Sequence, residues 1–167
     1  LQTQRGASTA QAGVTLTMGA VGWALGSQVQ GRLYARLPKG RLVELGALLV
    51  AFCLSWAVLS LVPSLPFWII IPGWTVGAMG MGMSFGSIGS LVLELSPPED
   101  QGANVASLQV CDSVGSVLLV GLAGAIYGAA LAAGSVSSST FVAIWVVMAA
   151  IALAGAVLAR RIRVRPV

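Results

Sequence analysis

Two long stretches without a charged residue constrain this chain more than any other feature. No Asp, Glu, Lys or Arg occurs between Glu44 and Glu94, or between Asp112 and Arg160. Each stretch is longer than the roughly 20 apolar residues that span a bilayer as a helix. Only 8% of the residues are charged, whereas soluble domains contain about 25%. The chain has too few charges to cover a water-soluble surface, and it is predicted to be an integral membrane protein.

The apolar runs predict helices rather than strands. A span must satisfy its own backbone hydrogen bonds, which leaves helices or a closed barrel. Barrel strands alternate apolar and polar residues over about ten positions, and these runs are continuously apolar. We therefore expect an all-α membrane protein, a bundle of five transmembrane helices in one domain over residues 1–167. The predicted spans lie at about residues 10–30, 42–62, 67–93, 101–131 and 139–159, followed by a tail at 160–167.

The basic residues predict the orientation of these spans. The nine Lys and Arg residues are, apart from Arg5, confined to the first connection and to the tail. Five spans place these two segments on one side, which the positive-inside rule makes cytoplasmic. The expected location is the cell membrane, with several spans, a cytoplasmic tail and unspecific contact with anionic membrane lipids. No aromatic-interleaved basic surface or soluble domain accompanies the charges, so nucleic-acid binding is not expected. The eight clustered residues are Arg32, Arg36, Lys39, Arg41, Arg160, Arg161, Arg163 and Arg165.

Three spans carry glycines at helical spacing, which marks faces where helices approach closely in lipid. Two interpretations stay open, because such stripes serve either tight packing of the bundle or bending and sliding during gating. The third span has small residues on two sides and is expected to be central, whereas the bulky second and fifth spans are expected to face lipid. The stripes comprise Gly19, Gly22 and Gly26, then Gly73, Gly77 and Gly80, then Gly121, Gly124 and Gly128.

Asp112 is an acidic residue inside the fourth predicted span. At 1.5 Å per residue it lies about 14 Å beyond Ala103, near the middle of a hydrocarbon core about 30 Å thick. An ionised carboxylate there costs at least about 2.5–3.5 kcal/mol, so it must face protein or water or be protonated. Gln109 and Ser116 share its helix face. Asp112 is either a proton-coupling or cation-recognising group lining a cavity, or a structural carboxylate bonded to a neighbouring helix.

Three segments, in this order, resemble the C-terminal part of a major facilitator superfamily transporter. GRLYARLPKGRLVELG at residues 31–46 resembles the superfamily's cytoplasmic loop signature. RGASTAQAG resembles the external lead-in to the eighth helix of bacterial drug and metabolite exporters. PPEDQGANVASLQVCDSVGSVLLVGLAGAIYG is similar to the penultimate helix of actinobacterial members.

The loop signature is degraded in this chain. Gly31, Arg36 and Arg41 fit the pattern, as does Leu33, and Arg32 and Lys39 add basic residues. Ala35 stands where the signature has aspartate, and Pro38 stands where it has glycine.

The resemblance implies a fold and a function. The superfamily encloses its substrate at the bilayer midplane between two six-helix halves. The five spans would be the last five helices of such a transporter, with Leu1 and Gln2 ending the seventh. The implied function is secondary active transport, as proton-coupled export (antiport) of a small organic compound that the sequence does not specify. The implied partners are the remaining helices of the transporter.

Other classes of function have less support. The chain contains no His and no G-x-x-x-x-G-K-[ST] run, which removes the commonest catalytic base and the usual ATP-binding loop. An enzyme needs several converging polar groups, so no enzymatic activity, cofactor or metal site is expected. Cys53 and Cys111 fall inside predicted spans, where they resemble small buried hydrophobes. The alternative is a non-transporting multi-pass membrane subunit that packs with a partner through its glycine-rich faces.

Overall fold

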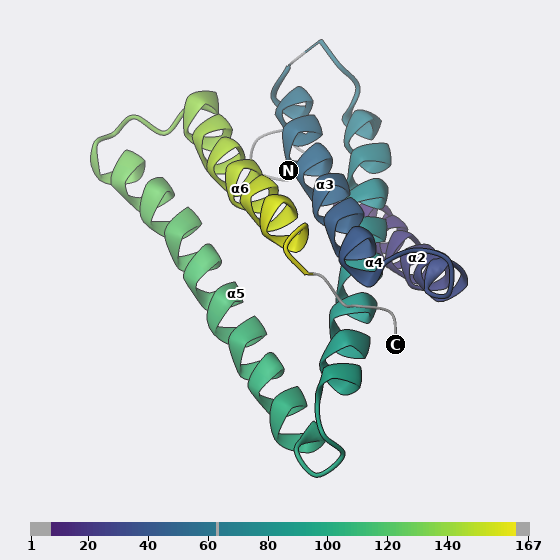
Figure 1. Cartoon of the computed structure of the whole chain (residues 1–167). Helices are drawn as coiled ribbons and strands as arrows, with labels where there is room; N and C mark the ends of the chain where they lie inside the picture. The colour runs from purple at the N-terminus through teal and green to yellow at the C-terminus, as the bar shows by residue number, and fades with distance from the viewer. Residues whose placement is uncertain (1–7, 63, 163–167) are drawn as a thin grey trace.

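The computed structural model of the chain describes residues 8–62 and 64–162. Over these residues the chain is all-helical, with short connections (Figure 1). The predicted seventh-helix end at Leu1 and Gln2 and the tail residues 163–167 lie outside the described residues. The helices are α2 (Thr9–Leu33), α3 (Lys39–Ala57), α4 (Ile70–Leu95), α5 (Gln101–Ala132) and α6 (Ser138–Ala159), with 3-10 turns η1 (Val58–Leu61) and η2 (Phe67–Ile69).

In the described part of the chain, four helical segments are long and apolar enough to cross a membrane. They are Lys39–Leu61, Phe67–Leu95, Gln101–Ala132 and Ser138–Ala159. The first predicted span, now α2, is not among them, because Thr15, Thr17 and the Ser27–Gln28 pair dilute its apolar residues. These four segments indicate that the chain is a multi-pass membrane protein. Whether α2 also crosses the membrane stays a prediction.

Local sequence explains where several helices begin and end. Ser8 and Gln11 form a reciprocal capping box at the start of α2, with Ser8 Oγ accepting from Gln11 N at 3.2 Å and Gln11 Oε1 accepting from Ser8 N at 2.9 Å. Such a box satisfies two backbone donors that a helix start leaves unpaired. Gly134 follows the last turn of α5 with φ +63°, a conformation that glycine adopts without strain.

Helix α3 lies between α4 and α6, and α2 packs on α4 (Figure 1). Helix α3 is packed on two sides, because Gly40 and Gly46 let neighbouring backbone approach it. Its bulky Leu45, Leu48 and Phe52 side chains remain exposed. In helix α6 the buried residues are the small Thr140, Ala149, Ala156 and Ala159. The expectation that the second and fifth spans face lipid stays a prediction.

Helix α5 stands apart from the other helices (Figure 1) and contains no buried residue. It is held at its ends. Near its start, Asn104 Nδ2 donates to Ser96 Oγ at 2.8 Å and Gln101 Nε2 donates to the Leu93 carbonyl at 3.0 Å. Near its end, the Tyr127 ring lies 6.0 Å from that of Phe141. The middle of α5, which includes Asp112, is consequently exposed in this chain.

Candidate functional site

The first glycine stripe forms the contact between α2 and α4. Gly22 and Gly26 are buried, and a Cβ on either would overlap a backbone carbonyl oxygen of α4, that of Thr75 or Met79. Gly19 is covered by the indole ring of Trp74. The two backbones touch directly, so no side chain fits at these positions unless the helices separate.

The second stripe forms the contact between α4 and α3. Gly73 and Gly77 are buried against the side chains of Trp56 and Cys53. A Cβ on Gly80 would lie 2.5 Å from the Gly46 carbonyl oxygen. On the other side of α4, a Cβ on Gly82 would overlap the Trp23 carbonyl oxygen of α2. Helix α4 is thus contacted closely on two sides.

The third stripe has no such partner. Among residues 8–62 and 64–162, no atom outside the local helix backbone lies within 4 Å of a Cβ placed on Gly121, Gly124 or Gly128. All three residues are exposed. The structure therefore does not bring this stripe together with the others, and a packing role for it stays a prediction.

The polar face of α5 is equally uncovered. Gln109, Asp112 and Ser116 are exposed, and none of their side chains forms a hydrogen bond or an ion pair within residues 8–62 and 64–162. Their spacing keeps them on one face of an unbroken helix. The described chain thus presents a polar face with a carboxylate and supplies nothing to pair with it.

The charged ends of α3 and α6 meet around a buried carboxylate that sequence reasoning missed. Glu44 is only 3% exposed. Arg160 Nε, at the end of α6, donates to Glu44 Oε1 at 2.6 Å, and Arg41 Nη1 donates to Oε2 at 3.3 Å. Beside it, Val43, Leu91 and Ala159 form a small apolar core. Burying a carboxylate is costly unless it is paired, and the two guanidinium groups supply that pairing.

A second carboxylate ties the connection after α2 to the end of α4. Glu94 accepts a hydrogen bond from the Tyr34 hydroxyl and forms an ion pair with Lys39 Nζ. Lys39 Nζ also lies 4.7 Å from the centroid of the Tyr34 ring, within cation–π range. We call Tyr34, Lys39, Arg41, Glu44, Glu94 and Arg160 the charged cluster.

The charged cluster contains only part of the predicted loop signature. Lys39 and Arg41 belong to it, whereas Gly31, Arg32 and Arg36 are exposed, and these two arginines form no side-chain hydrogen bond or ion pair in the part of the chain that is described. The Arg41–Glu44 spacing of three residues is a local signal that could have indicated the pair. Arg160 lies 116 residues from Glu44, and no local pattern predicts that contact.

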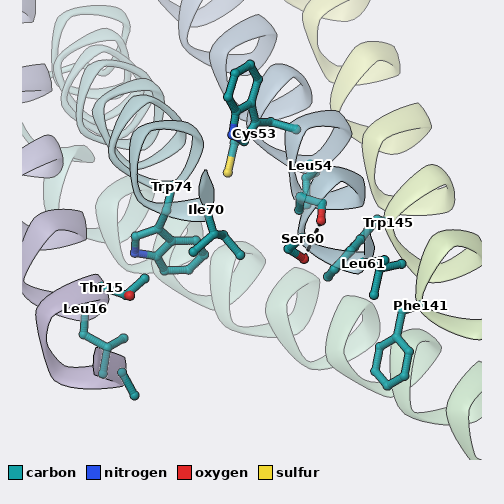
Figure 2. Close-up of a pocket in the computed structure, with 13 residues that line it drawn as sticks. Thr15, Leu16, Cys53, Leu54, Ser60, Leu61, Ile70, Trp74, Phe141 and Trp145 are labelled. Carbon is teal, nitrogen blue, oxygen red and sulfur yellow. Dashed lines mark hydrogen bonds between the residues drawn. The ribbon is translucent and has the colours of Figure 1, made fainter. Parts of the chain in front are cut away.

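An apolar cavity of about 400 Å³ lies at the end of the helix bundle opposite the charged cluster. Figure 2 shows residues that line it. Aromatic side chains from α3, α4 and α6 line it, together with residues of α2. Its polar atoms include Thr15 Oγ1, which donates to the Gln11 carbonyl at 3.0 Å, and Trp56 Nε1, which donates to the Ile69 carbonyl at 2.7 Å. The lining contains no Asp, Glu, Lys or Arg, so the cavity suits an apolar molecule better than acid–base chemistry. The aromatic lining residues are Trp56, Trp74, Phe141 and Trp145.

Within 8–62 and 64–162, no group of three or more His, Cys, Asp or Glu side chains lies close enough to hold a metal ion. Cys53 packs against Gly77 on one side of the bundle, and Cys111 is exposed on α5.

Comparison with known proteins identifies a family for the whole chain. The family model described as Major Facilitator Superfamily matches residues 1–167. The comparisons with curated proteins and with solved structures returned no match. The family match covers the separated helix α5 as well as the packed helices.

Proposed function

Because the chain belongs to the Major Facilitator Superfamily, we propose that it is part of a secondary active transporter that exports a small organic compound from the cell in exchange for protons. The family match over residues 1–167 carries this proposal. Proteins of this family are transporters rather than enzymes, which agrees with the expectation of no enzymatic activity. The same match does not favour the alternative of a non-transporting membrane subunit.

We place the chain in the C-terminal half of the transporter, of the drug or metabolite exporter type. The α2–α4 and α3–α4 contacts build a block of closely packed helices, while α5 presents an uncovered polar face. In this superfamily a substrate is enclosed between two such halves at the bilayer midplane. The remaining helices of the transporter would cover the face of α5 that carries Gln109, Asp112 and Ser116.

Asp112 is the proposed proton-coupling residue. It lies about 16 Å from the start of α5 at 1.5 Å per residue, deep enough that acyl chains would be an unfavourable environment for a carboxylate. Gln109 and Ser116 on the same face provide hydrogen-bonding neighbours for a substrate or for ordered water. A carboxylate that is wet in one state and covered in the other can bind a proton and release it.

The charged cluster is proposed to lie at the cytoplasmic surface. It joins the connection after α2 to the ends of α4 and α6 through Glu44 and Glu94. These bonds make the ends of the helices move as one body, as rigid-body rocking of a transporter half requires. The localisation in the cell membrane with a cytoplasmic tail follows from this placement and from the positive-inside rule.

Transport by the complete transporter containing this chain tests the proposal. Proteoliposomes with an imposed proton gradient would be loaded with fluorescent organic compounds such as ethidium and a Hoechst dye. Asp112→Asn should abolish the gradient-driven flux and leave protein yield unchanged. The matched control is Glu99→Gln, which alters an exposed carboxylate before α5 and should leave flux intact. Unchanged flux in Asp112→Asn would reject coupling through this residue, and gradient-independent movement by the unaltered protein would reject proton-coupled export.

A further inference from the structure

We propose that the seam between α3 and α6 binds a single anionic phospholipid, with its phosphate at the charged cluster and one acyl chain in an apolar groove along the same seam. The proposal makes the general expectation of lipid contact specific to one site. It requires only that the helices lie in a membrane, and it does not depend on proton-coupled export.

The headgroup would occupy a pocket of about 560 Å³ at the charged end of the two helices. Its walls are the start of α3 and the end of α6, which lie side by side (Figure 1). Lys39, Arg41 and Arg160 contribute positive charge, and Glu44 is the acidic residue of the lining. Lys39 is also paired with Glu94. The two carboxylates offset two of the three cations, so the wall keeps a net positive charge that favours an anion.

The two arginines keep hydrogen-bond donors that Glu44 does not use. Arg160 donates to Glu44 through Nε, which leaves both of its Nη groups free of this bond. Arg41 donates through Nη1 alone, and the two side chains are 62% and 67% exposed. The buried carboxylate thus holds two guanidinium groups in place at the mouth of a pocket. Guanidinium groups bind phosphate oxygens through paired charge-assisted hydrogen bonds.

The acyl chain would occupy a second, apolar pocket of about 400 Å³ farther along the seam. Leu54 and Val58 form one side of it, and Trp145, Val146 and Leu153 form the other. Ser55, which also lines it, already donates to the Ala51 carbonyl at 2.9 Å.

The apolar groove begins within the leaflet that contains the headgroup pocket. Leu153 is six residues before Ala159, or about 9 Å along α6 at 1.5 Å per residue, and Trp145, at the far end of the lining, is about 21 Å from Ala159. One leaflet contributes about 15 Å of hydrocarbon, half of the core thickness. A phosphate beside Arg160 and a chain end between Leu54 and Leu153 therefore suit one lipid molecule. A free phosphate ion would fill only the first pocket.

Binding can be measured on the full chain in detergent, by thermal unfolding and by native mass spectrometry. Dioleoyl phosphatidylglycerol should remain bound and raise the unfolding temperature, while dioleoyl phosphatidylcholine should do neither. Inorganic phosphate at the same concentration should have little effect. Equal stabilisation by inorganic phosphate, or equal retention of the two lipids, would overturn the proposal.

Two variants test the two parts of the site separately. Arg41→Gln removes one proposed phosphate ligand and keeps the shorter Arg160–Glu44 bond, so the protein should fold and bind phosphatidylglycerol about tenfold more weakly. Ala150→Trp, at an exposed position of the groove lining, should also weaken binding by filling the groove. Arg36→Gln, at an exposed arginine outside both pockets, is the matched control and should bind as the unaltered chain does. Equal weakening by Arg36→Gln and Arg41→Gln would show unspecific attraction, and unchanged binding in Arg41→Gln or Ala150→Trp would likewise refute the site.

Discussion

Helices α4 and α5 carry glycine stripes of nearly the same spacing, yet they occupy opposite environments. Gly73, Gly77 and Gly80 of α4 are buried against α3, whereas Gly124 and its stripe neighbours on α5 contact nothing within the described chain. A small-residue stripe therefore indicates a helix that another helix can approach closely. It does not indicate that an approaching helix is present in the same stretch of chain.

The packed block of α2, α3, α4 and α6 and the separate helix α5 also differ in how they hold acidic groups. At the charged end of the packed block, Glu44 is buried and bonded to two guanidinium groups. Asp112 on α5 is exposed and has no partner in the described part of the protein. A paired, buried carboxylate stabilises the arrangement around it, while an unpaired one is available for a ligand or a proton. The packed block therefore contains the paired carboxylate, and α5 contains the one proposed to act in transport.

The largest expected effect comes from adding a side chain to the packed stripe. Gly26→Val should destabilise the full chain by roughly 3 kcal/mol, because the new Cβ overlaps the Met79 carbonyl and forces α2 from α4. Unfolding in detergent measured by circular dichroism would detect the loss. The matched variant Gly124→Val should change stability by less than about 0.5 kcal/mol. Equal losses in the two variants would mean that α5 is packed as tightly as α4.

An intermediate effect is expected from neutralising the two acidic groups. Glu44→Gln should lower the stability of the full chain by about 1–2 kcal/mol, since both ion pairs are lost but the exposed arginines remain solvated. Asp112→Asn should leave stability unchanged within about 0.5 kcal/mol, because no partner in the described chain loses a bond. The same unfolding measurement applies. Comparable destabilisation by Asp112→Asn would indicate an intramolecular partner for Asp112 and weaken its proposed role in coupling.

The smallest effect is expected from chemical labelling of the two native cysteines, which requires no substitution. Cys111 on α5 is exposed, whereas Cys53 on α3 packs against Gly77. N-ethylmaleimide should modify Cys111 several times faster than Cys53 in detergent, because thiol reactivity requires access. Mass spectrometry of the labelled peptides would give both rates. Similar rates at the two sites would show either that α5 is covered in solution or that the α3–α4 contact opens readily.

The sequence alone accounts for the helical class and the multi-pass membrane character, and the order of three motifs indicated the family. Long uncharged runs predict the first two properties, because the free energy of placing a side chain in hydrocarbon depends mainly on that side chain. The glycine stripes of α2 and α4 were also visible as potential contact faces. The sequence signal for a membrane span was weaker in α2 than in the other helices. Its threonine, serine and glutamine residues lower its hydropathy, so composition does not decide whether α2 crosses the membrane.

The candidate site was harder to predict from sequence. The signature pattern singled out Arg32 and Arg36, which are exposed and unpaired in the described chain, and it missed Glu44 and Arg160, which bond to each other. A sequence motif selects residues by their position along the chain and does not indicate which of them are buried. Whether a charge is buried depends on which distant segment covers it.

Local chemistry thus determined that this chain forms apolar helices, with Asp112 far from either end of one of them, since membrane insertion of a helix depends on about 20 consecutive residues. Tertiary structure determined that α3 lies between α4 and α6 and that Glu44 bonds to Arg160. It also determined that neighbouring helices cover the glycine stripes of α2 and α4 while the stripe of α5 is exposed. Those outcomes depend on the fit between surfaces far apart in the chain, where a single Cβ or a single guanidinium group determines whether two helices can touch.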